Sequence, residues 1–210
     1  MANPNMQHTK NFKRAGRDLA AAEKVLIMIH GRGGSAEDIL SLATHFAVTD
    51  YALIAPQATG NTWYPYSFMA APAQNEPWLS SALSIIREIV SDLIDNGIPT
   101  EKIYFLGFSQ GACLTLEYVT RNASQYGGVV AFTGGLIGDK IYDENYQGDF
   151  KSTPIFIGTS DPDPHVPVER VQATGDLLKK INANVTITVY NNMGHTISQD
   201  EIEMANRIVF

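Results

Sequence analysis

The residues between Ile103 and Ala112 constrain the fold of this chain more than any other stretch. An apolar run rich in β-forming residues ends at Gly107-Phe108-Ser109-Gln110-Gly111, and the residues that follow have a helical pattern. A G-x-S-x-G sequence between a strand and a helix predicts a nucleophile elbow, a tight turn that lifts Ser109 out of the sheet. Both glycines are required because side chains at these positions would collide with neighbouring backbone. The alternative interpretation is a strand–turn–helix with an incidental serine.

Apolar strands and amphipathic helices alternate along the chain. Strands are predicted over 25–29, 51–55, 103–108, 129–132, 154–158 and 185–190. Helices are predicted over 39–46, 78–96, 112–121, 168–181 and 199–210. This order predicts an α/β fold with a mostly parallel central sheet and helices on both faces. We expect one domain over residues 1–210, in which residues 1–20 form a short edge hairpin or a tail.

The charge and the single cysteine exclude several classes of protein. The formal net charge of −7 argues against nucleic acid and anionic membranes as partners, because both require a basic surface. One cysteine permits no internal disulfide. The N-terminal 24 residues are polar, and no apolar run is long enough to span a bilayer, so neither a signal peptide nor membrane insertion is expected. These features predict a cytoplasmic protein.

Chemically active residues follow four of the predicted strands. Ligands of parallel sheets bind at the carboxyl ends of the strands, so the four loops are expected to meet at one edge. A serine needs an adjacent base, and His195 in the loop after the last strand is the best placed histidine. A carboxylate must orient that imidazole, and the loop after the preceding strand offers Asp161 and Asp163. The order serine, aspartate, histidine is that of α/β-hydrolases.

Other candidate groups favour structural roles. His30 ends a strand in a glycine-rich loop and is expected to hold that loop by hydrogen bonds. His165 lies beside two aspartates, but the spacing matches no known metal site, so we expect no metal. Cys113 is expected to be a small buried apolar residue. The Gly31-Arg32-Gly33-Gly34 run lacks the lysine and the spacing of nucleotide-binding loops, and no cofactor is expected.

With these residues assembled, the chain resembles the phospholipase/carboxylesterase family of α/β-hydrolases, which includes acyl-protein thioesterases. The resemblance runs from about Val25 to the C-terminus. It rests on three motifs: His30-Gly31-Arg32-Gly33, Gly107-Phe108-Ser109-Gln110-Gly111 and Met193-Gly194-His195. Asn61-Thr62-Trp63-Tyr64 is similar to the segment of this family that carries a pocket tryptophan.

The resemblance implies a role for each matching residue. Ser109 would be the nucleophile and His195 the general base, and the backbone N–H groups of Arg32 and Gln110 would form the oxyanion hole. The family pattern of Gly-x-x-Asp followed by Pro-x-Val-Pro leaves the acid open, because this chain has two extra residues between those anchors. Counting from Gly158 selects Asp161. Asp163 keeps the Asp-Pro-x-Val-Pro motif intact and is favoured.

The aromatic segment after the second buried strand bears on the substrate. We expect Trp63, Tyr64, Tyr66 and Phe68 to line the substrate pocket and to shorten it, which favours small or medium acyl esters over long lipid chains. The alternative is that these aromatics cover a sheet edge or form a homodimer surface.

The predicted activity is that of a serine carboxylesterase that forms an acyl-enzyme and acts on small-molecule esters. Acyl-protein thioesterase or lysophospholipase activity is the alternative within the family. A dienelactone-type hydrolase or a peptidase on the same fold, and a non-catalytic scaffold that acts as a binding module, also stay open.

Overall fold

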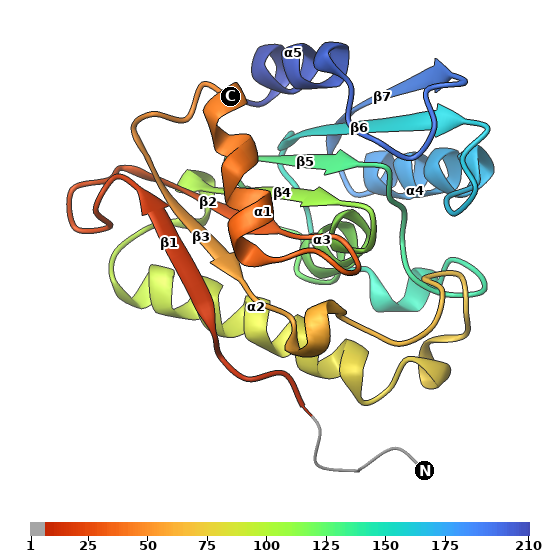
Figure 1. The fold of residues 1–210 in the computed structure, drawn as a ribbon, viewed down its shortest axis with the longest axis horizontal. Coiled ribbons are helices and arrows are strands. Elements are labelled where there is room, and N and C mark those ends of the chain that lie inside the picture. Colours follow the sequence, from red (N-terminus) through yellow and green to blue (C-terminus); the bar gives the residue numbers. More distant parts are fainter. Residues whose placement is uncertain (1–6) are drawn as a thin grey trace.

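The computed structural model describes residues 7–210, and its centre is a seven-stranded sheet with helices on both faces (Figure 1). The strands are β1 (Phe12–Gly16), β2 (Lys24–Ile29), β3 (Tyr51–Pro56), β4 (Ile103–Phe108), β5 (Gly128–Phe132), β6 (Pro154–Asp161) and β7 (Asn184–Asn191). The α-helices are α1 (Ala36–Ser41), α2 (Trp78–Asp95), α3 (Gln110–Arg121), α4 (Val168–Lys180) and α5 (Gln199–Ile208). The predicted α/β-hydrolase architecture is confirmed.

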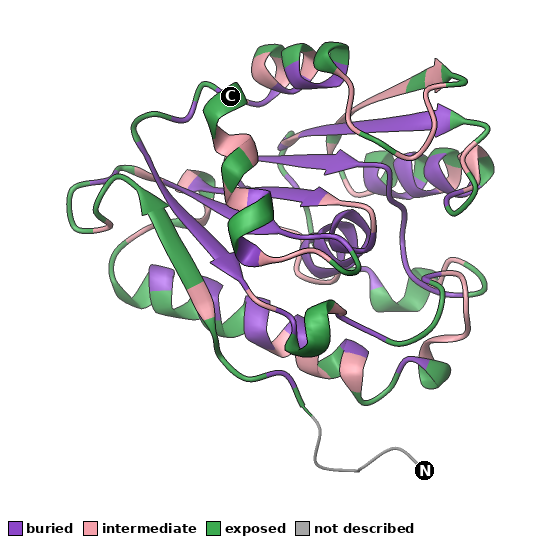
Figure 2. Cartoon of the chain, in the orientation of Figure 1, coloured by how far each residue is buried: buried purple, intermediate pink, exposed green. Residues whose placement is uncertain are grey.

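The strands lie in the order β1-β3-β2-β4-β5-β6-β7, and only β1 runs antiparallel to its neighbour. Apolar side chains of α2, α3 and α4 pack on one face of the sheet, whereas α1 and α5 cover the other. The inner strands are therefore buried on both faces, which explains their continuous apolar runs. Figure 2 shows these strands in purple and the edge strand β1 mostly in green.

The helix boundaries follow the predicted capping signals. Ser35 and Asp38 form a capping box at the start of α1, and Ser198 forms the equivalent box with Glu201 at α5. Gly97 has a φ of 85° after α2, a left-handed conformation that ends a helix most easily at glycine. Helix α3 begins at Gln110, directly after Ser109, which is two residues earlier than the apolar pattern predicted.

Strand β1 corrects one expectation and extends the sheet. Of the stretch 1–20, residues 1–6 lie outside the described residues. Residues 12–16 lie at the sheet edge but form a single strand rather than a hairpin, and this strand pairs antiparallel with β3. The strand that follows in sequence, β2, lies on the far side of β3. Because this pairing is non-local, no turn signal in the sequence could reveal it. In the described part of the chain, no helix is long and apolar enough to cross a membrane.

Candidate active site

The turn between β4 and α3 holds Ser109 in a strained conformation. Ser109 has φ 55° and ψ −120°, values that a residue with a side chain seldom adopts. A Cβ atom on Gly107 would collide with the backbone of Gly111, and one on Gly111 would collide with the carbonyl groups of Ile29 and His30. The steric reason predicted for the two glycines is therefore confirmed. The turn presents Ser109 Oγ at the carboxyl edge of the sheet.

His195 lies between the serine and an aspartate. Its Nε2 atom is 2.8 Å from Ser109 Oγ, and its Nδ1 atom is 2.8 Å from Asp163 Oδ2. The loop that carries His195 is tied to β6 because Gly194 N donates to Ser160 Oγ over 3.0 Å. Three loops from distant parts of the sequence thus meet at one sheet edge, with the spacing that proton transfer requires.

Of the two candidate aspartates, only Asp163 contacts His195. Its carboxylate also accepts hydrogen bonds from the backbone N–H groups of His165 and Val166, each over 2.8 Å. Burial opposes ionisation of Asp163, but these N–H groups and the His195 ring hold the pKa of its carboxyl below the ordinary value. Asp161 is exposed at the end of β6, where its backbone carbonyl accepts from Asn192.

The loop after β2 packs directly against the elbow. A Cβ atom on Gly31 would lie 3.3 Å from the Phe108 carbonyl oxygen and 3.4 Å from Ser109 Cβ. His30 secures this loop as predicted, since its Nδ1 donates to the Gly31 carbonyl over 2.7 Å and its Nε2 accepts from Ala58 N. Within residues 7–210, the backbone N–H groups of Arg32 and Gln110 have no hydrogen-bond acceptor.

A cavity of about 510 Å³ opens beside the serine. Its walls come from the elbow, from the aromatic segment and from the loop that carries Asp163. They consist of Arg32, Tyr64, Pro65, Tyr66, Ser67, Phe68, Ser109, Gln110, Cys113, Pro164, His165, Val166 and His195. Ser109 and His195 both line this cavity, so the pair is a candidate nucleophile and base with room for a ligand beside it.

Comparison with known proteins agrees with this geometry. Residues 17–209 match the phospholipase/carboxylesterase family. The chain belongs to that family. Its members are serine hydrolases that act on ester bonds.

The relatives of this α/β-hydrolase differ in sequence identity and in the fraction of the two chains that can be aligned. A crystal structure of a phospholipase/carboxylesterase from Dyadobacter fermentans is 53% identical, covers 99% of both chains and has a TM-score of 0.96. Acyl-protein thioesterase 1 of Kluyveromyces lactis is 26% identical over 92% of this chain and 93% of its own. The protein of the same name from Neurospora crassa is 30% identical over 62% of this chain, but over only 54% of its own.

Arg32 and Gln110 also hold residues 64–68, the segment that forms the aromatic wall of the hydrolase cavity. The Arg32 guanidinium donates to the carbonyls of Tyr64, Pro65 and Tyr66 at 2.8–3.0 Å. Gln110 Nε2 donates to the same Tyr64 carbonyl over 2.8 Å, and Gln110 Oε1 accepts from the backbone N–H of Trp63, also over 2.8 Å. The two residues with free backbone N–H groups therefore fix one loop through their side chains.

Three of the four aromatic residues predicted to line the substrate pocket do line the cavity, whereas the fourth, Trp63, does not. Tyr64, Tyr66 and Phe68 line it, and Tyr66 is 59% exposed. Trp63 does not line it. Its ring is fully buried, and its Nε1 donates to the His30 carbonyl over 2.8 Å. Trp63 and Tyr64 are both buried in the core, and of the two only Tyr64 also reaches the cavity, a difference that composition alone could not reveal.

The sequence interpretation missed several cavity residues. The centroid of the His165 ring lies 4.9 Å from that of the His195 ring in an edge-to-face arrangement. The Phe108 ring, which is not part of the cavity lining, lies 5.4 Å from the His195 ring. His165 follows Asp163 within the Asp-Pro-His-Val-Pro motif, and this adjacency was the available signal. Cys113 is buried as expected, yet it also contributes to the cavity wall, and burial raises the pKa of its thiol to about 12.

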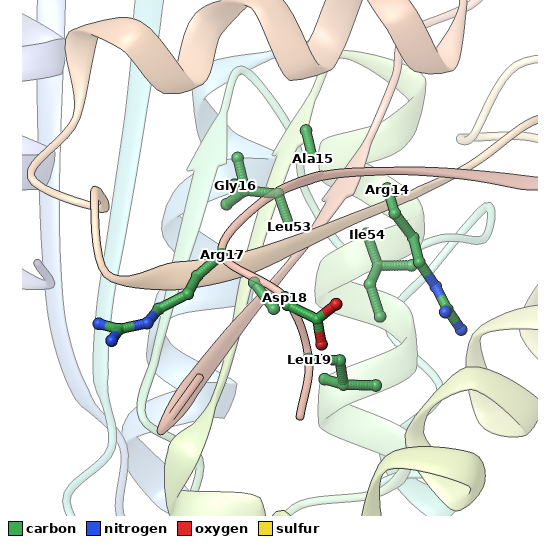
Figure 3. Close-up of a pocket in the computed structure, with 9 residues that line it drawn as sticks. Arg14, Ala15, Gly16, Arg17, Asp18, Leu19, Leu53 and Ile54 are labelled. Carbon is green, nitrogen blue, oxygen red and sulfur yellow. The ribbon is translucent and has the colours of Figure 1, made fainter. Parts of the chain in front are cut away.

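A second cavity, of about 200 Å³, lies far from the elbow, at the outer edge of the sheet. Figure 3 shows the side chains of Arg14 and Arg17 extending in opposite directions, with Asp18 between them. Arg17 pairs with Asp50 over 3.2 Å. This cavity contains no serine, cysteine or histidine, so it offers no nucleophile–base pair.

Proposed function

We propose that this chain hydrolyses small or medium acyl esters by two-step acyl transfer through Ser109. The observation that carries the proposal is the His195 ring, whose two nitrogens lie 2.8 Å from Ser109 Oγ and 2.8 Å from Asp163 Oδ2. A serine hydroxyl becomes an effective nucleophile when such a base removes its proton.

In the first step, Ser109 Oγ attacks the carbonyl carbon of the ester while His195 Nε2 takes the hydroxyl proton. Asp163 orients the imidazole and stabilises the imidazolium. The backbone N–H groups of Arg32 and Gln110 stabilise the oxyanion of the tetrahedral intermediate. His195 then donates its proton to the leaving alcohol, and the acyl group stays on Ser109.

In the second step, His195 Nε2 removes a proton from water, and the resulting hydroxyl attacks the acyl-enzyme carbonyl. Collapse of this intermediate returns the proton to Ser109 and releases the acid. A thioester follows the same steps with a thiol as the leaving group. The names of the Kluyveromyces lactis and Neurospora crassa relatives favour thioesters as the second candidate substrate class.

The aromatic lining of the cavity supports a short or medium acyl group. The aromatic wall is held by the hydrogen bonds of Arg32 and Gln110, so it does not recede easily. Pro65 and the rings of Tyr64, Tyr66 and Phe68 form one continuous segment of the cavity wall, and they reduce the room left for a long acyl chain.

Mass spectrometry after treatment with a fluorophosphonate tests the proposal. We expect one adduct, mapped by digestion to Ser109 and lost in His195→Ala. Ser67 is a matched control because it lines the same cavity without contacting an imidazole, so Ser67→Ala is expected to retain the adduct. A protein that stays unlabelled, or that is labelled elsewhere, would support the binding-scaffold alternative instead.

A further inference from the structure

The two edge strands of the sheet differ in how they are protected from other strands. An open edge presents unpaired N–H and C=O groups, and proteins commonly block such edges with charged side chains. β1 carries Lys13 and Arg14, and Arg17 follows it, all three exposed. β7 carries no charged residue along its eight positions, and within residues 7–210 no strand pairs with its outer side. Val189 on β7 is 36% exposed, and Figure 2 shows β7 mostly in pink and green.

The sequence of β7 is self-complementary. Val185-Thr186-Ile187-Thr188-Val189 is the same when read in either direction. If two copies pair antiparallel about Ile187, this residue lies opposite itself, Thr186 lies opposite Thr188, and Val185 lies opposite Val189. Cross-strand pairs of β-branched residues and of threonines are favourable, and a twofold interface requires such self-matching.

The faces of the strand agree with this register. A Cβ atom on Gly175 of α4 would meet the Ile187 side chain, which places the odd-numbered residues of β7 on the α4 face. Tyr190 Oη donates to Asp200 of α5 over 2.7 Å, which places the even-numbered residues on the opposite face. Pairing about Ile187 keeps apolar residues with apolar residues and threonines with threonines.

The charges at the two ends of β7 are also complementary. Exposed Lys179 and Lys180 end α4 just before the strand begins. At the other end lie exposed Asp161, on the neighbouring strand β6, and Asp200, which accepts from Tyr190. Antiparallel pairing sets the basic end of one copy beside the acidic end of the other. A second copy of this chain therefore fits the edge in both shape and charge.

We propose that the chain forms a twofold homodimer in which β7 pairs antiparallel with β7 of a second copy, centred on Ile187. The two sheets then form one continuous sheet, with β1 at both outer edges. No residue of β7 lines the cavity, so this interface is independent of the proposed activity.

Sedimentation velocity of the full chain tests the interface. We expect the wild-type protein to sediment at twice the chain mass of 23.0 kDa, and Val189→Lys to sediment at the single mass. Ala15→Lys on β1 is the matched control, because it adds the same charge to the other edge, and it is expected to stay dimeric. Thermal unfolding followed by circular dichroism checks that each variant folds.

Cysteine cross-linking tests the register. Cys113, the one native cysteine, is buried, so an introduced thiol is the reactive one. Ile187→Cys is expected to form an intermolecular disulfide under mild oxidation, because paired residues have Cα atoms within about 7 Å. Val189→Cys lies opposite Val185 rather than itself and is expected not to cross-link.

Three results would overturn the proposal. The first is a wild-type protein that sediments as a monomer. The second is a dimer that survives Val189→Lys and dissociates with Tyr66→Lys, which would place the interface on the aromatic segment. The third is cross-linking of Val189→Cys without cross-linking of Ile187→Cys, which would exclude the register.

Discussion

His195 Nδ1 lies 2.8 Å from Asp163 Oδ2, although a second aspartate, Asp161, stands where β6 ends. Asp163 lies two residues beyond Asp161 and therefore in the loop after the strand. The N–H groups of His165 and Val166 then fix the carboxylate, so its orientation does not depend on His195 alone.

The two aspartates are expected to respond differently to the same substitution. Asp163→Asn keeps the shape of the side chain but stabilises the wrong tautomer of His195, so kcat should fall by about 10⁴-fold. Asp161→Asn should leave kcat near the parent value. Steady-state hydrolysis of p-nitrophenyl butyrate measures both. A larger loss of kcat in Asp161→Asn than in Asp163→Asn would show that Asp161, and not Asp163, orients His195.

Gln110 is expected to affect both stability and turnover. Its buried side chain holds the segment around Trp63 and Tyr64, and Gln110→Ala would leave a buried N–H group without its acceptor. We expect a loss of about 1–3 kcal/mol in the free energy of unfolding by urea, and a lower kcat/KM. Gln199→Ala, on the exposed surface of α5, is the control and should change stability by less than about 0.5 kcal/mol. Equal free energies of unfolding for Gln110→Ala and Gln199→Ala would show that the Gln110 side chain does not stabilise the segment around Trp63 and Tyr64.

The acyl-length preference is expected to depend on Tyr66. The wild-type chain should turn over acetyl and butyryl p-nitrophenyl esters faster than octanoyl and palmitoyl esters. Tyr66→Ala removes a largely exposed ring from the cavity wall and should shift the optimum toward octanoyl with little change in stability. A palmitoyl optimum in the wild-type chain would exclude the short-pocket proposal.

His30 is expected to make folding stability pH-dependent. Burial lowers the pKa of its imidazole, and the bond to the Gly31 carbonyl opposes this only in part. The folded pKa is therefore below the unfolded value of about 6.5. Below that pH the unfolded chain binds more protons, so the free energy of unfolding should fall, by at most about 1.4 kcal/mol per pH unit for this residue.

Urea unfolding between pH 8 and pH 5 measures this effect. His30→Gln should flatten the profile over this range. Identical slopes in the wild-type chain and in His30→Gln would show that the pKa of His30 does not differ between the folded and unfolded states.

The sequence predicted the parts of this molecule that local patterns encode. Apolar runs located six strands, and Ser35 and Ser198 marked the starts of two helices, because capping and turn chemistry act over a few residues. The pairing of β1 with β3 and the direction of the Trp63 ring depend on contacts distant in sequence. The Asp-Pro-His-Val-Pro motif favoured Asp163 over Asp161, but the distance between Asp163 and His195 depends on the pairing of β6 with β7.

The shared use of the Tyr64 carbonyl by Arg32 and Gln110 has a consequence for how this site could change during evolution. The backbone groups proposed to stabilise the oxyanion belong to the residues whose side chains fix the aromatic wall. A substitution that moves the wall to admit another acyl group would therefore also move the oxyanion donors. Selection for new substrates is then expected to alter kcat together with KM, unless it acts on rings such as Tyr66 that project from the wall without holding it.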